Sequence, residues 1–86
     1  MIDDRDPLVF EVTVREGASE SRHRVTLSRR DFERLGAGAG AERLIAAAFR
    51  FLLDREAKES ILARFDVSVI AGYFPDFERK LPHYLA

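Results

Sequence analysis

Two segments near the start of the chain alternate between apolar and polar residues, which is the spacing of half-buried β-strands. In residues 8–15 every second residue from Leu8 onward is apolar, and the intervening positions are mostly polar. In residues 20–27 the same alternation places His23 and Val25 on one face. Residues 16–19 contain a glycine, so the pattern predicts an antiparallel hairpin with these four residues as its loop.

The loop position also predicts the register of this hairpin. With residues 16–19 as the loop, Arg15 lies opposite Glu20 and Glu11 lies opposite Arg24 on the outer face. Both pairs are charge-complementary, which favours this register. A shift of two residues would keep the same faces, so the alternation of faces alone leaves that second register open.

The middle of the chain has the spacing of helices. A short helix is predicted from Arg29 to about Leu35, with Ser28 as its cap and Gly36 as its left-handed stop. Residues 37–40 form a glycine-rich connector that lacks the Lys-Ser/Thr of a phosphate loop. The strongest helix covers residues 41–54. Its apolar stripe consists of Leu44, Ile45, Ala48, Phe49, Leu52 and Leu53.

The C-terminal third contains signals for two more short helices. Residues 55–60 break the apolar pattern and predict a helix end or a loop. Asp66 is a suitable cap for a helix from Val67 to Tyr73. Pro75 ends that helix and can begin a last one that runs to about Leu81, followed by a tail over residues 82–86.

These elements predict an α+β fold in the order β-β-α-α-α-α, with a two-stranded antiparallel hairpin packed on three to four helices. The chain has 86 residues, which corresponds to one domain. Residues 1–7 are expected to be a mobile lead-in, and residues 8–86 the single α+β domain.

Composition argues against several classes of protein. Fourteen basic and fifteen acidic residues give a net charge of −1, whereas nucleic-acid binders and polybasic membrane anchors carry a basic excess. The absence of cysteine excludes disulfides, thiolate catalysis and cysteine-based zinc sites. The N-terminus lacks the apolar core of a signal peptide, and no apolar run could cross a membrane, so a cytoplasmic location is expected.

No group of residues has the spacing of a catalytic, metal or cofactor site. His23 is expected to be a partly buried structural residue and His83 a surface residue, since neither has a nearby ligand or base in the sequence. Helix capping, helix dipoles and solvated helix ends account for the carboxylates, and no serine has a Gly-x-Ser-x-Gly setting. The sequence thus favours a protein that is not an enzyme. A deep pocket lined by His23 with an arginine and a carboxylate would reopen that hypothesis.

Basic residues are concentrated between Arg22 and Arg34, where five arginines accompany two carboxylates. Such a patch can hold phosphates of a nucleic acid or an acidic partner, although a solvated face with ordinary ion pairs is the simpler interpretation. The candidate contact residues are Arg15, Arg22, Arg24, Arg29, Arg30 and Arg34.

The C-terminal region has more apolar surface than a small domain readily covers. Phe74 and Phe77 are expected in the core. Tyr73, Tyr84 and Leu85 have no obvious cover within the chain, which makes them candidate interface residues. The surplus predicts a homodimer or a protein partner.

Three motifs in the second half of the chain carry a resemblance to other proteins. Phe-Leu-Leu-Asp-Arg-Glu begins at Phe51, Glu-Ser-Ile-Leu at Glu59 and Tyr-Phe-Pro at Tyr73. Together with the valine-rich first strand, they resemble a family of small uncharacterised bacterial proteins over nearly the whole chain. The resemblance implies no activity, cofactor or site residue. Ala57 stands where such proteins often have proline, which leaves the helix end near Arg55 less sharply defined.

The sequence therefore leads to two functional hypotheses. The first is a non-catalytic protein–protein interaction domain, either a homodimer or an adaptor for another protein. The alternative is a nucleic-acid-associated regulator that uses the basic patch at residues 22–34. Binding to random DNA with a steep salt dependence would distinguish the second from the first.

Overall fold

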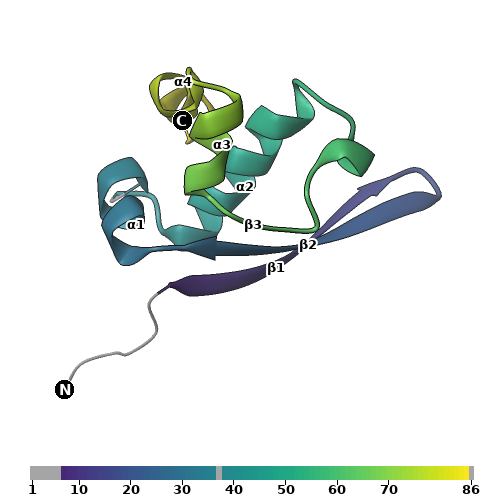
Figure 1. Ribbon diagram of the computed structural model, residues 1–86, viewed down its shortest axis with the longest axis horizontal. Coiled ribbons are helices and arrows are strands. Elements are labelled where there is room, and N and C mark those ends of the chain that lie inside the picture. The colour runs from purple at the N-terminus through teal and green to yellow at the C-terminus, as the bar shows by residue number, and fades with distance from the viewer. Residues whose placement is uncertain (1–6, 37, 86) are drawn as a thin grey trace.

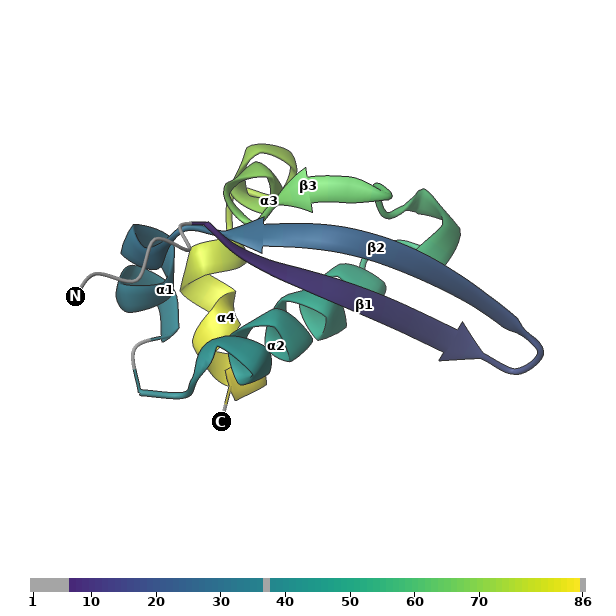
Figure 2. The same ribbon diagram turned by 90° about the horizontal axis from the view of Figure 1, so that it is seen from below.

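The protein, seen in a computed structural model that describes residues 7–36 and 38–85, is a three-stranded sheet with helices on one face (Figures 1 and 2). The predicted lead-in over residues 1–7 lies outside the described residues except for Pro7, which is exposed. None of the helices in the described ranges is long and apolar enough to span a bilayer. The elements are β1 (Leu8–Glu16), β2 (Ser19–Leu27), α1 (Arg29–Gly36), α2 (Ala41–Leu53), the short 3-10 helix η1 (Lys58–Ser60), β3 (Arg64–Asp66), α3 (Ser68–Tyr73) and α4 (Phe77–Leu85).

Strands β1 and β2 form the predicted hairpin in the predicted register. Glu11 lies opposite Arg24, and Arg15 lies opposite Glu20. The two pairs form ion pairs of 2.6 and 3.2 Å between their side chains. The charge pattern on the outer face therefore identified the correct register.

The turn of the hairpin is shorter than the four-residue loop expected for residues 16–19. The strands continue to Glu16 and Ser19, which leaves only Gly17 and Ala18 in the turn. Gly17 has a φ of 60°, and no residue other than glycine has a positive φ among the described residues. A positive φ at the first turn position is typical of the type II′ turns whose twist matches that of the strands, and it favours glycine there.

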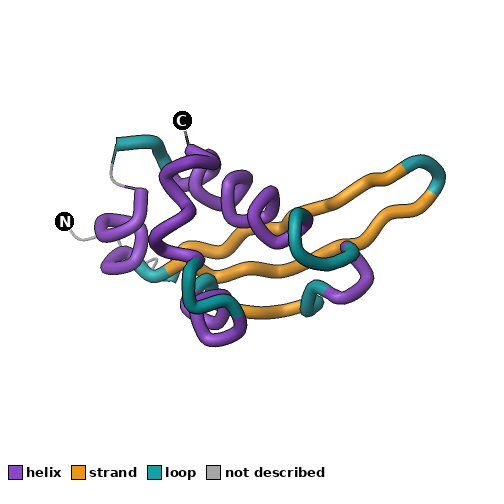
Figure 3. Tube along the Cα trace, turned by 90° about the horizontal axis from the view of Figure 1, so that it is seen from above, coloured by secondary structure: helices purple, strands orange, loops and turns teal. Residues whose placement is uncertain are grey.

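A third strand corrects the fold prediction, and the element order is β-β-α-α-β-α-α. Strand β3 pairs in parallel with β2, so that β2 is central (Figure 3). The Arg24 N–H donates to the Ala63 carbonyl at 2.7 Å, and the Val67 N–H donates to the Thr26 carbonyl at 2.9 Å. Three residues are too few to show an alternation, so hydrophobic periodicity could not reveal this strand.

Helix α2 lies between the sheet and α4, and its apolar surface is wider than the predicted stripe. Phe49 faces the sheet side, with its ring centroid 5.4 Å from that of His23 and 6.0 Å from that of Phe65. Phe51 lies on the opposite side of the helix and is fully buried, 5.0 Å from the ring of Phe77. Leu53, which was placed on the stripe, is only half-buried.

Gly36 is the last residue of α1, and it does not have the left-handed conformation expected of a helix stop. It is buried, and a Cβ at this position would lie 3.2 Å from the Leu44 Cδ1 atom. The glycine therefore allows α1 to approach α2 closely. The predicted cap at the other end is present, because the Asp31 N–H donates to the Ser28 hydroxyl oxygen at 3.1 Å.

Helix α4 corrects the prediction of a helix that ends near Leu81. It begins at Phe77 rather than at Pro75 and continues through Pro82 to Leu85. Proline inside a helix removes one backbone hydrogen bond. A tertiary contact offsets this lost hydrogen bond, because the ring of Tyr84, beyond the proline, packs edge-on against that of Phe51 at 5.9 Å.

Asp66 bonds the start of α3, although α3 begins at Ser68 rather than at the predicted Val67, and Val67 is in the cap position without a side-chain cap bond. The Asp66 carboxylate accepts the Ser68 N–H at 3.1 Å and the Thr26 hydroxyl at 2.5 Å. We expect Asp66→Ala to lower the free energy of unfolding by about 0.5–2 kcal/mol, and Asp66→Asn by less, because an amide oxygen can still accept the N–H. Urea denaturation measures both, and equal losses would show that the negative charge itself is required.

The same carboxylate predicts a change of stability with pH. Burial raises the pKa of Asp66, but hydrogen bonds from Thr26 and Ser68 outweigh it and hold this pKa below its ordinary value. The contribution of the Asp66 carboxylate to the free energy of unfolding is therefore complete above the unfolded-state pKa of about 3.9. This contribution is lost as the pH falls through the folded-state pKa of Asp66. Acid unfolding curves of wild type and Asp66→Asn should accordingly converge below about pH 4.

Candidate functional site

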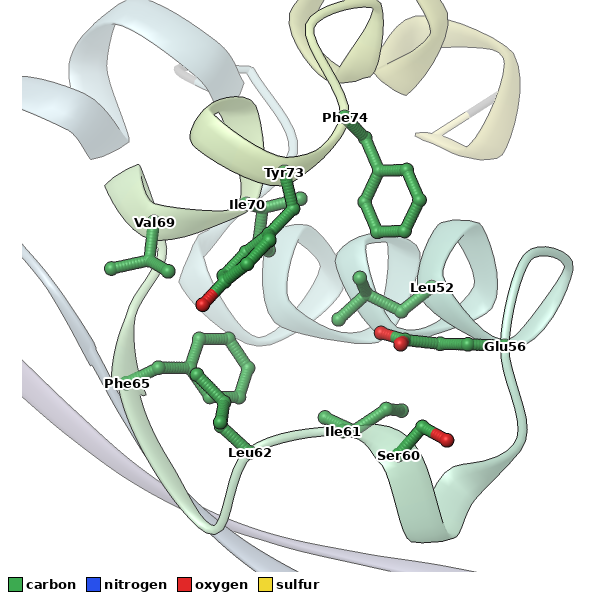
Figure 4. A pocket seen from close by; sticks show the side chains of 10 residues that line it. All are labelled: Leu52, Glu56, Ser60, Ile61, Leu62, Phe65, Val69, Ile70, Tyr73 and Phe74. Carbon is green, nitrogen blue, oxygen red and sulfur yellow. The ribbon is translucent and has the colours of Figure 1, made fainter.

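An open apolar cavity of about 190 Å³ lies between α2, η1, β3 and α3 (Figure 4). Segments far apart in the sequence meet here, since the walls come from the end of α2, the segment after η1, and α3. We call this cavity the groove. It is lined by Leu52, Glu56, Ser60, Ile61, Leu62, Phe65, Val69, Ile70, Tyr73 and Phe74.

Within the described ranges, most of the large apolar side chains that are exposed lie around the groove. Leu62, Val69 and Tyr73 are 47%, 36% and 67% exposed, and they are three of the four large apolar residues that are exposed in the described parts of the chain. The fourth, Val9, lies on β1 away from the groove and is 56% exposed. Exposed apolar residues that cluster around a hollow are typical of a surface that contacts another molecule.

Polar groups are few in the groove. The Glu56 side chain reaches towards the hollow from one end, and Ser60 lies beside it (Figure 4). Among residues 7–36 and 38–85, no side chain forms a hydrogen bond or ion pair with the half-buried Glu56 carboxylate. An unpaired carboxylate beside an apolar floor can receive a basic group from a bound partner.

The size of the groove limits what it can hold. Sites for cofactors and drug-sized molecules have volumes of roughly 300–1,000 Å³. The groove, at about 190 Å³, is smaller and open to solvent on one side. Its volume and lining suit one or two apolar side chains that project from a partner.

His23 holds the segment that carries Leu62. It is 3% exposed, and its Nδ1 lies 2.8 Å from the Leu62 carbonyl oxygen. Because a carbonyl can only accept, Nδ1 carries a proton, and in the neutral ring Nε2 then accepts the Ser21 hydroxyl at 2.8 Å. His23 therefore fixes the position of one wall of the groove.

The pair of Ser21 and His23 does not form an accessible catalytic site. A serine next to a histidine can act as nucleophile and base. Neither residue lines the groove, however, and the His23 ring is buried against Phe49. The pocket lined by His23 that would have reopened the enzyme hypothesis is therefore not formed by the groove. The second histidine, His83, is exposed on α4, as expected.

Lys58 is a structural residue that the sequence did not reveal. It is only 2% exposed, and its Nζ lies 2.5 Å from a Glu59 carboxylate oxygen and 3.5 Å from one of Glu16. The hydrogen bond to Glu59 raises the pKa of Lys58 against the effect of burial, and it lowers the pKa of Glu59. The lysine thus ties η1, which precedes the groove residue Ile61, to the turn end of the hairpin.

The six candidate arginines do not form one uninterrupted basic surface. Arg15 and Arg22 both pair with Glu20, at 3.2 and 3.3 Å, on the outer face of the hairpin. Arg34, on α1, pairs with Asp31 at 2.9 Å and with Glu78 at 2.5 Å.

The other three arginines belong to the same two groups. Arg24 pairs with Glu11 on the outer face of the hairpin. Arg29 is half-buried and Arg30 is exposed, both on α1. Carboxylates thus alternate with arginines across the predicted patch.

The three candidate interface residues have different environments. Tyr84 is half-buried, and its hydroxyl donates to the Asp54 carboxylate at 2.6 Å. Leu85 is half-buried against the core. Tyr73 stays exposed on the rim of the groove, so it is the one of the three that the groove includes.

The comparisons with known proteins do not assign this chain to a family. Comparisons with protein-family models, with curated proteins and with solved structures find no match. The resemblance to small bacterial proteins therefore stays a prediction. In the described parts of the chain, no three His, Cys, Asp or Glu side chains are grouped so that they could hold a metal ion.

Proposed function

We propose that this protein is a non-catalytic interaction domain whose groove binds apolar side chains of another protein. The observation that carries the proposal is the clustering of Leu62, Val69 and Tyr73 around one small cavity. The groove is lined mainly by hydrophobic side chains and has one unpaired carboxylate. Anchor side chains that fill such cavities contribute most of the affinity at many protein interfaces.

The lining of the groove supports a proposal for the chemistry of its partner. Its buried floor, formed by Leu52, Ile61 and Ile70, suits an aliphatic or aromatic anchor. The carboxylate of Glu56 at one end suits a lysine or arginine next to that anchor. The proposed occupant is therefore a segment of another protein that presents an apolar anchor followed or preceded by a basic residue.

The nucleic-acid alternative has less support. An arginine that already pairs with a carboxylate must give up that ion pair before it can bind a phosphate. Arg15, Arg22, Arg24 and Arg34 each pair with a carboxylate of this chain. We therefore place the binding function in the groove rather than on the outer face of the hairpin.

A peptide selection with two matched variants tests the proposal. Random peptides displayed on phage are selected on the wild-type protein, synthesised, and titrated by fluorescence polarisation. We expect Leu62→Asp to weaken the binding of the selected peptides roughly ten-fold or more, because it places a charge on the wall of the groove. Val9→Asp is the matched control, since Val9 is as exposed as Leu62 but lies outside the groove.

The outcomes separate clearly. Peptides that lose affinity for Leu62→Asp and keep it for Val9→Asp would support the groove as the binding site. A shared motif of an apolar residue beside a basic residue would support the proposed contact with the Glu56 carboxylate. Equal binding to both variants, or a selection that yields no binding peptide, would overturn the proposal. The thermal midpoints of both variants should stay near that of wild type, because both positions are exposed.

A further inference from the structure

Strand β1 is a nine-residue strand at the edge of the sheet. Figure 2 shows β2 on one side of it and no described strand or helix paired along its other side. The turn end of the hairpin also extends beyond the helices in two views (Figures 1 and 2). A long open edge offers a row of backbone donors and acceptors to another strand.

The hydrogen bonds of β2 show which β1 residues face this edge. Arg24 and Thr26 direct a backbone group to the β3 side, through their bonds to Ala63 and Val67. In an antiparallel ladder the partner of such a residue turns its own backbone groups away from β2. Glu11, which is the partner of Arg24, therefore faces the open edge.

The alternation of the ladder extends this result along the strand. Every second residue of β1 turns its N–H and C=O groups to the edge, so Val9, Thr13 and Arg15 face it together with Glu11. Their side chains lie on the outer face, and none of these residues is a proline that would interrupt pairing.

We infer that β1 pairs with β1 of a second copy of this chain, antiparallel, with Thr13 opposite Thr13 of that copy. In this register Glu11 lies opposite Arg15 of the second copy, and Arg15 lies opposite its Glu11. On the inner face, Val12 lies opposite Val14 of the second copy. The result is a continuous six-stranded sheet with a two-fold axis at Thr13.

Charge complementarity selects this register over its neighbours. Only shifts of two residues keep the inner and outer faces continuous. With Glu11 on the axis, two carboxylates would lie opposite each other, which is unfavourable. With Val12 on the axis, Glu11 would face Thr13 and Arg15 would face Val9. With Val14 on the axis, Arg15 would face Thr13 and Glu11 would face Gly17. In both registers neither charge would have a partner of opposite sign.

With Thr13 on the axis, the charges alternate in sign across four strands. Arg24 already lies opposite Glu11, and Arg15 lies opposite Glu20, within one copy. The proposed pairing joins these into a row that reads Arg24, Glu11, then Arg15 and Glu20 of the second copy. The two-fold axis generates the same row a second time. This inference uses the edge opposite β3 and does not rest on the function proposed for the groove.

Single-cysteine cross-linking tests the register directly, because the chain has no cysteine of its own. Residues directly opposite in a hydrogen-bonded antiparallel pair have Cα atoms about 5.5 Å apart, which suits a disulfide. We expect Thr13→Cys to form a disulfide-linked dimer on mild oxidation, reversible by a reducing agent. Val9→Cys is the matched control, because Val9 faces the same edge and its replacement keeps both charges of the proposed pairs. Residues 9 of the two copies would be offset by roughly 26 Å along the strand, out of reach of a disulfide.

A second measurement examines the unmodified protein. Sedimentation equilibrium at micromolar concentration should give wild type about twice the 9.8 kDa mass of one chain. Thr13→Asp should give the single-chain mass with an almost unchanged thermal midpoint, because two carboxylates would meet on the axis while the exposed position tolerates the change within one chain.

Four results would overturn the inference. The first three are a wild-type mass of 9.8 kDa throughout, no cross-link in Thr13→Cys, and equal cross-linking in Val9→Cys. The fourth is a dimer that persists in Thr13→Asp, which would place the contact on another surface.

Discussion

Phe51→Ala is expected to lower the free energy of unfolding by about 3–5 kcal/mol, which is a large part of the stability of a small domain. Phe51 is fully buried and contacts three other aromatic rings edge-on. Its ring also lies 3.6 Å beneath the Arg55 guanidinium carbon. Removal of the ring leaves a cavity where α2 meets α4 and the Phe74 segment.

Urea or guanidinium denaturation measures this effect. Tyr73→Ala is the matched control, because it removes an aromatic ring that is largely exposed; we expect it to change stability by less than about 0.5 kcal/mol. If Phe51→Ala were as stable as Tyr73→Ala, the contact between α2 and α4 described above would be wrong.

His23→Ala is expected to lower the free energy of unfolding by about 2–4 kcal/mol, since it combines a cavity with the loss of two hydrogen bonds. The change would leave the Leu62 carbonyl and the half-buried Ser21 hydroxyl without their present partner. It would also release one wall of the groove. We therefore expect faster amide hydrogen exchange at residues 61–63 and weaker binding of groove-selected peptides under conditions where the variant is still folded.

The second histidine provides the control for this experiment. His83 is exposed on α4, and His83→Ala should leave both stability and peptide binding close to wild type. A His23→Ala variant that loses stability but keeps unchanged exchange at residues 61–63 would show that His23 supports the core without positioning Leu62.

The hairpin could be predicted from the sequence because its signals are local and agree with one another. Alternation identifies the inner face, and the pairs of Glu11 with Arg24 and Arg15 with Glu20 identify the register. Strand β3 could not be predicted in this way. It has three residues, and its pairing depends on the meeting of Arg24 with Ala63 across the fold.

The helices show where local signals fail. Phe51 lies off the stripe that contains Phe49, and only the packing of α4 makes its side of α2 part of the core. Pro82 signals a helix end, but the contact of Tyr84 with Phe51 keeps α4 helical beyond it. In both cases a tertiary contact outweighs the local preference.

The groove was only partly visible in the sequence. Tyr73 stood out as an aromatic residue without an obvious cover, whereas no sequence pattern distinguished Leu62 or Val69 as exposed. Their exposure depends on how η1, β3 and α3 follow one another, which periodicity does not determine.

The central position of β2 has a consequence for how strongly this protein could hold a partner. The groove lies on the β3 side of β2, and the open edge of β1 lies on the other. Two copies joined through β1 would therefore keep both grooves accessible, facing away from the shared edge. Such an assembly is bivalent. A partner with two anchor segments on a linker of suitable length would bind the second groove at a high effective concentration, so that two weak contacts could combine into strong avidity.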